Sequence, residues 1–167
     1  MTAPGSLAMA EPVHVPEVGQ EAPDFELVNQ FGEPVRLSSF RGRNVVVVFY
    51  PFAFSGICTG ELCEIRDNLA LFEDASATVL GVSADSKFTL RAYADKEGYG
   101  FELLADFWPH GAVAKLYGVF DPASGMARRG TFIIDGEGVV RYVVVNPRGQ
   151  ARDLAEYRRV LAGLGQG

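Results

Sequence analysis

The residues best suited to chemistry in this sequence lie together between positions 51 and 63. Pro51, Ser55 and Cys58 follow one another at spacings of four and three residues, and a second cysteine, Cys63, comes five residues later. A cysteine thiolate is a strong nucleophile, and a helix N-terminus favours thiolate over thiol through its free N–H groups and positive dipole end. We expect the hydroxyl of Ser55 within hydrogen-bonding reach of the Cys58 sulfur, and Pro51 would shield that sulfur from water. The group therefore indicates thiol chemistry centred on Cys58.

The elements around this group place Cys58 at the start of a helix. Residues 44–50 (NVVVVFY) form a continuous β-branched and aromatic run, which is typical of a central strand buried on both faces. Pro51 ends that strand, because proline cannot donate to the hydrogen-bond ladder. Residues 58–72 carry apolar side chains at helical spacing and predict one helix. Cys58 would thus follow a strand and a short loop.

The rest of the pattern defines the fold class. Further elements are expected at residues 25–27, 35–37, 78–83, 86–97, 102–104, 110–117, 130–135, 139–145 and from Asp153 onward. The resulting order is a β-hairpin, a β-α-β-α unit, a second β-hairpin around 136–138 and a closing helix. This order predicts an α/β thioredoxin-like fold, with a mixed central sheet, helices on both faces and an N-terminal β-hairpin.

Length and composition limit the organisation of the chain. The 167 residues suit one domain, and 48% hydrophobic with 22% charged residues excludes a disordered chain. Residues 1–18 are rich in proline and poor in large apolar groups, which indicates a flexible N-terminal arm. We therefore expect a single domain over residues 19–167.

Charge and apolar runs exclude several partners. A net charge of -6 argues against nucleic-acid binding, which needs a basic surface. The longest apolar stretch, residues 45–54, is shorter than the roughly 20 residues of a membrane-spanning helix. The N-terminus has no secretory signal pattern, and two cysteines are too few for a disulfide-stapled domain or a structural zinc site. We expect a cytoplasmic protein without a membrane anchor or a bound metal.

The spacing P-x-x-x-[ST]-x-x-C, met by Pro51, Ser55 and Cys58, resembles the active-site motif of the peroxiredoxins, which are thiol peroxidases of the thioredoxin-like fold. The resemblance continues in segments that together cover nearly all of the chain after about residue 19. These segments are APDFEL (22–27), LLADFWPHGAVAKLYGVF (103–120) and RRGTFIIDGEGVVRY (128–142). The amino-acid sequences of these segments are most similar to the alkyl hydroperoxide reductase E branch, where FWPHGA, YGVF and RGTF recur in this order.

The resemblance implies a specific activity. The Cys58 thiolate would attack hydrogen peroxide, an organic hydroperoxide or peroxynitrite and become a sulfenic acid, without any metal or other cofactor. The implied reductant is a thiol: a thioredoxin, a glutaredoxin-like protein or a low-molecular-weight thiol. The resemblance also implies a homodimer or a higher homo-oligomer.

Arg129 corresponds, by this resemblance, to the active-site arginine of the family. A fixed guanidinium can donate to both sulfur and peroxide oxygen and stabilise the charge that moves between them. Arg128 would point to the opposite face of an extended segment, which favours Arg129. Glu61 is a possible supporting residue that orients Arg129, although an acidic residue expected in the first helical turn is also explained by the helix dipole.

Cys63 departs from the branch that the sequence most resembles, in which one cysteine is expected. A cysteine five residues after the first resembles the peroxiredoxin Q, or bacterioferritin comigratory, branch, where it resolves the sulfenic acid as a disulfide. In an intact helix the two Cα atoms are about 8.6 Å apart, whereas a disulfide needs less than about 7 Å, so the first turn would have to unravel. The other interpretation is a small buried apolar residue, with an external thiol as the resolving group.

Two alternative functions use the same cysteine. A thioredoxin-like disulfide oxidoreductase usually has C-x-x-C, and the C-x-x-x-x-C spacing here counts against it. A peroxide sensor that relays oxidation to a partner would share the Cys58 chemistry.

Phe107 and Trp108 are expected in the core or in a dimer contact rather than at the substrate, and His110 is expected to be a hydrogen-bonded or capping group.

Overall fold

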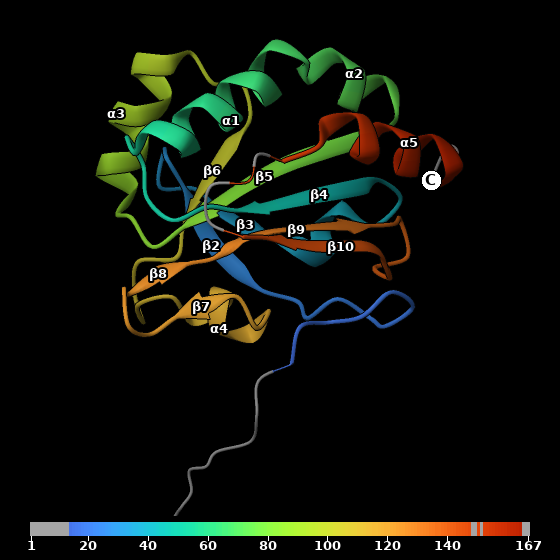
Figure 1. Ribbon diagram of the computed structural model, residues 1–167, viewed down its shortest axis with the longest axis horizontal. Coiled ribbons are helices and arrows are strands. Elements are labelled where there is room, and N and C mark those ends of the chain that lie inside the picture. The colour runs from blue at the N-terminus through green and yellow to red at the C-terminus, as the bar shows by residue number, and fades with distance from the viewer. Residues whose placement is uncertain (1–13, 148–149, 151, 165–167) are drawn as a thin grey trace, which may run out of the picture.

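The computed structural model describes residues 14–147, 150 and 152–164, and for residues 57–59 it describes the backbone alone (Figure 1). A seven-stranded sheet lies at the centre. In spatial order its strands are β10 (Val140–Asn146), β9 (Arg129–Ile134), β4 (Asn44–Phe49), β5 (Ala77–Ser83), β6 (Glu102–Ala105), β2 (Glu26–Asn29) and β3 (Pro34–Arg36).

The sheet is mixed, as predicted. Strands β4, β5 and β6 run parallel to one another, whereas β9 pairs antiparallel with β4 and with β10. The N-terminal hairpin of β2 and β3 joins the other side through an antiparallel pairing of β2 with β6. Because β4 and β5 are neighbours and parallel, the loops that follow them leave the same edge of the sheet.

Helices cover both faces of the sheet, which confirms the thioredoxin-like arrangement (Figure 1). The helices are α1 (Gly56–Asp67), α2 (Leu69–Asp74), α3 (Lys87–Glu97), α4 (Ala112–Leu116) and α5 (Leu154–Leu164), with a 3-10 turn at Leu37–Phe40. Helices α1, α2, α3 and α5 lie on one face, and α4 lies on the other with the small ribbon of β7 (Phe120–Asp121) and β8 (Met126–Ala127). No helix within the described ranges is long and apolar enough to cross a membrane.

The core is divided by the alternation of side chains along β4. Val46 and Val48 belong to the cluster beneath α1, α3 and α5, whereas Val45 and Val47 belong to the cluster on the α4 side. Every residue of β4 is buried, as the continuous apolar run predicted. This rigid central strand fixes the point at which the loop with Pro51 begins.

The prediction of a single helix over residues 58–72 is wrong, because two helices occupy this segment. Helix α1 begins two residues earlier, at Gly56, and ends at Asp67, and α2 starts at Leu69. Asn68 lies between them and its side-chain amide donates to the carbonyl of Glu64 at 2.8 Å. Such local side-chain bonds compete with the helical ladder, which explains the break.

The described part of the expected arm, residues 14–18, contacts the domain. Pro16 is buried, and Val15 packs against the core cluster on the α4 side. Gly118 has a φ of +71°, and a Cβ added there would lie 2.8 Å from the backbone nitrogen of Val15. Residues 1–13 lie outside the described residues, so the arm over 1–18 and the domain over 19–167 stay predictions.

Candidate active site

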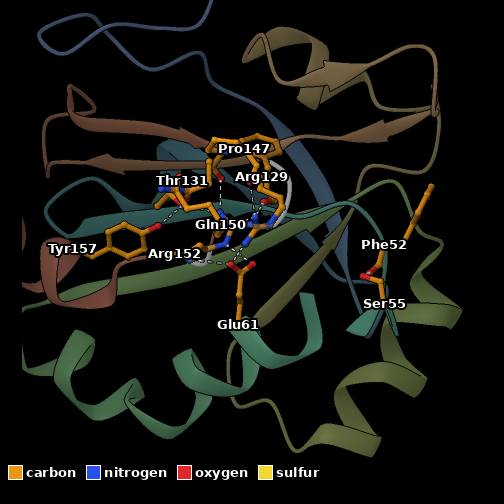
Figure 2. Close-up of polar contacts among 12 residues, drawn as sticks. Phe52, Ser55, Glu61, Arg129, Thr131, Pro147, Gln150, Arg152 and Tyr157 are labelled. Atoms are coloured by element: carbon orange, nitrogen blue, oxygen red, sulfur yellow. Dashed lines mark hydrogen bonds and ion pairs between the residues drawn. The ribbon is translucent and has the colours of Figure 1, made fainter. Parts of the chain in front are cut away.

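The loop after β4 leads directly into the helix that carries Cys58. Pro51 is half-buried, and Ser55 is the N-cap residue of α1, with its hydroxyl donating to the carbonyl of Phe52 at 2.9 Å (Figure 2). The N–H of Ala53 donates to a carboxylate oxygen of Asp85 at 2.8 Å, which ties this loop to the segment after β5. Cys58 is the third residue of α1 and so lies in its first turn, as expected. Its side chain lies outside the described residues, and its contact with Ser55 stays a prediction.

A buried ionic cluster lies where α1 faces β9. Glu61 on α1 forms an ion pair with the guanidinium of Arg129, the first residue of β9. The same carboxylate lies 3.3 Å from Nε of Arg152 and accepts the backbone N–H of Arg152 at 2.9 Å. Figure 2 shows Glu61 extending from α1 towards both guanidinium groups. All three side chains are at most 7% exposed.

The two arginines are fixed by backbone carbonyls as well. Arg129 donates to the carbonyl of Pro147 at 3.0 Å and to that of Gln150. Arg152 donates to the hydroxyl of Thr131 at 2.8 Å and to the carbonyl of Phe49 at the end of β4. Planar guanidinium groups held by several acceptors have little rotational freedom, so their charge is preorganised.

Among the described residues, the ion pairs of this cluster join one carboxylate to two guanidinium groups close to the start of α1. Buried charges interact strongly because water screens them poorly. The positive end of the α1 dipole lies at the same end of the helix. This end of α1 is therefore suited to stabilise an anion, such as a thiolate or a developing oxyanion.

The structure distinguishes between the two neighbouring arginines and corrects the placement of Glu61. Arg129 is buried and faces α1, whereas Arg128 precedes β9 and is exposed. Glu61 is the sixth residue of α1, so it belongs to the second turn and not to the first. The helix dipole therefore does not explain Glu61, and its ion pairs with two arginines do.

Arg152 is a member of this cluster that the sequence patterns did not indicate. It follows β10 in a segment without a recognisable motif, and its role depends on contacts with three distant segments. An arginine just before an amphipathic closing helix offers little signal by itself. Only the folded chain brings it to Glu61.

Cys63 lies on α1 and points away from this cluster, towards the end of α3. Its sulfur lies 3.5 Å from a carboxylate oxygen of Glu97 and 3.6 Å from the hydroxyl of Tyr99. The side chain is half-buried and packs at the edge of the core, and it forms no disulfide. The structure therefore keeps Cys63 in a polar environment rather than in a purely apolar one.

Comparison with known proteins decides the family. A family model described as the AhpC/TSA family matches residues 18–143. The chain belongs to this peroxiredoxin family. Alkyl hydroperoxide reductase E of Mycobacterium tuberculosis is 44% identical over 148 residues, which cover 88% of this chain and 97% of that protein. Peroxiredoxin-2 of Bos taurus is 37% identical over 154 residues, which cover 86% of this chain and 76% of that protein.

Solved peroxiredoxin structures share the fold of this chain. AhpC of Enterococcus faecalis superposes with a TM-score of 0.80 at 33% identity, covering 89% of this chain and 92% of that one. Peroxidoxin BcpB from Mycobacterium tuberculosis superposes with a TM-score of 0.78 at 33% identity, covering 89% and 96%. This peroxiredoxin is accordingly a thiol-dependent peroxidase with a thioredoxin-like fold.

The aromatic residues before α4 are not part of the core of this peroxiredoxin chain. Trp108 is 80% exposed and Phe107 is 51% exposed. They were expected in the core or in a dimer contact, and this exposure excludes the core. His110 is hydrogen-bonded, as expected, through Nε2 to the carbonyl of Gly125 at 2.6 Å. Within the described residues, no group of three or more His, Cys, Asp or Glu side chains is arranged to hold a metal ion.

Proposed function

We propose that Cys58 is the nucleophile of this peroxidase and that it reduces hydrogen peroxide and organic hydroperoxides. The observation that carries this proposal is the place of Cys58 in the first turn of α1, one turn before Glu61 and its two buried arginines. Both the helix end and the two nearby guanidinium groups favour a thiolate there.

The proposed reaction is a displacement at oxygen. The Cys58 thiolate donates an electron pair to one peroxide oxygen, and a sulfur–oxygen bond forms as the oxygen–oxygen bond breaks. The other oxygen leaves with the electrons of that bond and takes up a proton, giving water or an alcohol. The sulfur is oxidised to a sulfenic acid, which is the reversible first step of cysteine oxidation.

The neighbouring residues have separate roles in this proposal. Arg129 stabilises the negative charge as it moves from sulfur to the leaving oxygen, and its contact with Glu61 sets its orientation. Ser55 lies at the N-cap of α1, where its hydroxyl can contact the sulfur or the peroxide, and Pro51 limits the access of water.

The direct test replaces the nucleophile. Cys58→Ser is expected to abolish peroxide consumption measured with dithiothreitol as the reductant, because a serine hydroxyl is not ionised at neutral pH. Cys63→Ser is the matched control, and it should still form one sulfenic acid per chain. Peroxide consumption by Cys58→Ser at the wild-type rate would overturn the assignment.

We further propose that Cys63 resolves the sulfenic acid of Cys58 as a disulfide within the chain. The two residues lie on one helix, where positions five apart have Cα atoms about 8.6 Å from each other, so the first turn must unwind before the sulfurs can meet. Gly60, two residues after Cys58, weakens this end of the helix, because glycine in a helix interior is about 1 kcal/mol less favourable than alanine. Unchanged turnover of Cys63→Ser with a thioredoxin-type reductant would contradict the resolving role.

A thiol reductant then restores both cysteines in the proposed cycle. A thioredoxin, a glutaredoxin-like protein or a low-molecular-weight thiol would attack the disulfide by exchange, and the reducing cytoplasm is the compartment we propose for it. Comparing these three reductants at equal thiol concentration in a turnover assay identifies the preferred one.

We also propose that the exposed aromatic residues at the carboxyl edge of the parallel strands form a homodimer contact. Phe54 follows β4 and is 47% exposed, and Phe107 and Trp108 follow β6. A concentration of large exposed apolar side chains at one edge is unusual for a monomer and is typical of an interface. A second copy of this chain is the proposed partner.

A further inference from the structure

Cys63 has two polar neighbours that the peroxidase reaction at Cys58 does not explain. Glu97, the last residue of α3, places a carboxylate oxygen 3.5 Å from the sulfur, and the hydroxyl of Tyr99 lies 3.6 Å from it. A carboxylate can only accept a hydrogen bond, so the thiol proton of Cys63 is directed at Glu97. The thiol has no second proton, so in this contact the donor is the hydroxyl of Tyr99, which also has a hydrogen bond with Tyr93.

Tyr99 is well placed to remain such a donor. Tyr99 is only 7% exposed, and its ring stacks on Phe101 with ring centroids 5.2 Å apart and meets Tyr93 edge-on at 5.1 Å. Burial raises the pKa of the Tyr99 hydroxyl, so the group keeps its proton at neutral pH. The ring is therefore a fixed support that presents one O–H.

The part of α1 that carries Cys63 is anchored on both sides of that residue. Glu61 is bound to Arg129 and Arg152, and the guanidinium of Arg66 donates to the backbone carbonyl of Glu97. The first five residues of α1 include Gly56 and Gly60 instead. If α1 unwinds at its N-terminal end, Cys58 would move towards Cys63 while Cys63 stays beside its polar neighbours.

We propose that Glu97 is the general base and Tyr99 the hydrogen-bond donor that activate Cys63 for attack on the sulfenic acid of Cys58. This inference rests on the proposed resolving role of Cys63. The Cys63 sulfur donates an electron pair to the Cys58 sulfur and the disulfide forms as the sulfur–oxygen bond breaks. The thiol proton passes to Glu97, and the departing hydroxide takes up a proton and leaves as water. Tyr99 stabilises the negative charge on the Cys63 sulfur as its proton is lost.

The test measures disulfide closure separately from peroxide reaction. Reduced protein is mixed with one equivalent of hydrogen peroxide, and the remaining sulfenic acid is trapped with dimedone at successive times and counted by intact mass. Glu97→Gln should slow closure by about 100-fold, the typical contribution of a general base, while sulfenic acid formation keeps its rate. Tyr99→Phe should slow closure by about 10-fold, as expected for the loss of a hydrogen bond to a charged group.

Two controls separate a chemical role from a structural one. Glu64→Gln removes the same charge from the exposed neighbour of Cys63 on α1, and its closure rate should equal that of the wild type. Glu97→Ala should recover part of its closure rate when formate is added, because a small carboxylate can replace the missing base, whereas formate should not affect the wild type.

The outcomes distinguish this inference from the function on which it rests. Wild-type closure rates in both Glu97→Gln and Tyr99→Phe, in a protein that forms the disulfide, would overturn the activation of Cys63 and leave its resolving role intact. A wild-type protein that forms no disulfide within the chain would overturn the resolving role itself, and the role of Glu97 with it.

Discussion

At the residue scale, the account depends on two guanidinium groups that share one carboxylate inside the protein. Glu61 binds Arg129 and Arg152 while all three are nearly excluded from water. A buried charge that loses its partner is strongly destabilising, so the three residues form one unit. The two guanidinium groups are fixed near the start of α1 before any peroxide arrives, which is the condition for electrostatic stabilisation of a transition state.

Arg129→Gln is predicted to slow sulfenic acid formation at Cys58 by about 100-fold or more, because a fixed charge next to the moving electrons is lost. Arg128→Gln removes the same charge from the exposed neighbouring position and should leave the rate unchanged. Rapid mixing with hydrogen peroxide under pseudo-first-order conditions measures both rates. Equal rates in the two variants would contradict the assignment of Arg129.

Glu61→Gln is predicted to lower the free energy of unfolding by about 3–5 kcal/mol, since two buried arginines lose their counter-charge. Urea denaturation of the reduced protein measures this change. Glu64→Gln, on the exposed side of the same helix, should change it by less than about 0.5 kcal/mol. A Glu61→Gln variant as stable as the wild type would show that the ionic cluster contributes no stability.

Several residues of the candidate site could be predicted from the sequence, and others could not. Pro51, Ser55 and Cys58 form a local pattern on a strand, loop and helix, so their relative placement follows from short-range structure. Arg152 reaches Glu61, and Glu97 and Tyr99 reach Cys63, only through tertiary contacts between distant segments. No periodicity or spacing encodes such contacts.

At the element scale, the N-terminal end of α1 is less stable as a helix than its middle, which is held by tertiary contacts. Its first five residues include Gly56 and Gly60, whereas Glu61 and Arg66 connect the rest of the helix to β9 and α3. Glycine raises the free energy of a helix by about 1 kcal/mol relative to alanine. Unwinding of α1 is therefore expected to cost least at the end that carries Cys58.

Gly60→Ala is predicted to slow disulfide closure by roughly 5-fold. Alanine stabilises the helical state of this segment by about 1 kcal/mol relative to glycine, and the segment must unwind before the disulfide can form. A Cβ at this position meets no other atom within 4 Å, so the substitution adds no strain. Gly163→Ala in α5 is the matched control, since its Cβ is equally unobstructed and α5 takes no part in closure. Faster closure in Gly60→Ala would contradict the need to unwind the first turn.

The elements with strong patterns were predicted with nearly their observed bounds. The buried strand at 44–50, the C-terminal hairpin and the helix ended by Gly98 follow from β-branched runs, turn residues and caps. The break at Asn68 was missed because the apolar spacing continues across it. The ribbon of β7 and β8 was missed because strands of two residues carry no period.

At the scale of the whole molecule, exposed aromatic side chains gather where the parallel strands end. Phe54, Phe107 and Trp108 lie in the loops after β4 and β6, and Phe54 belongs to the loop that leads to Cys58. A contact between two copies at this edge would cover these rings and restrict access of water to both sites. The dimer would then influence the reaction as well as the stability of the chain.

Trp108→Ala is predicted to shift the protein from dimer to monomer, because aromatic anchors dominate the energy of such contacts. Sedimentation velocity at micromolar concentration measures the change in mass. Leu71→Ala on α2 removes a partly exposed apolar side chain outside these loops and should leave the mass unchanged. A wild type that sediments as a monomer would contradict the proposed interface.

The most direct test of the central claim is the intact mass of the reduced protein after one equivalent of hydrogen peroxide. The account predicts that the wild type loses two hydrogens as the disulfide closes, that Cys63→Ser gains one oxygen at Cys58, and that Cys58→Ser stays unchanged. A wild-type mass that does not change, or a Cys58→Ser variant that is oxidised as fast as the wild type, would contradict a peroxidase centred on Cys58.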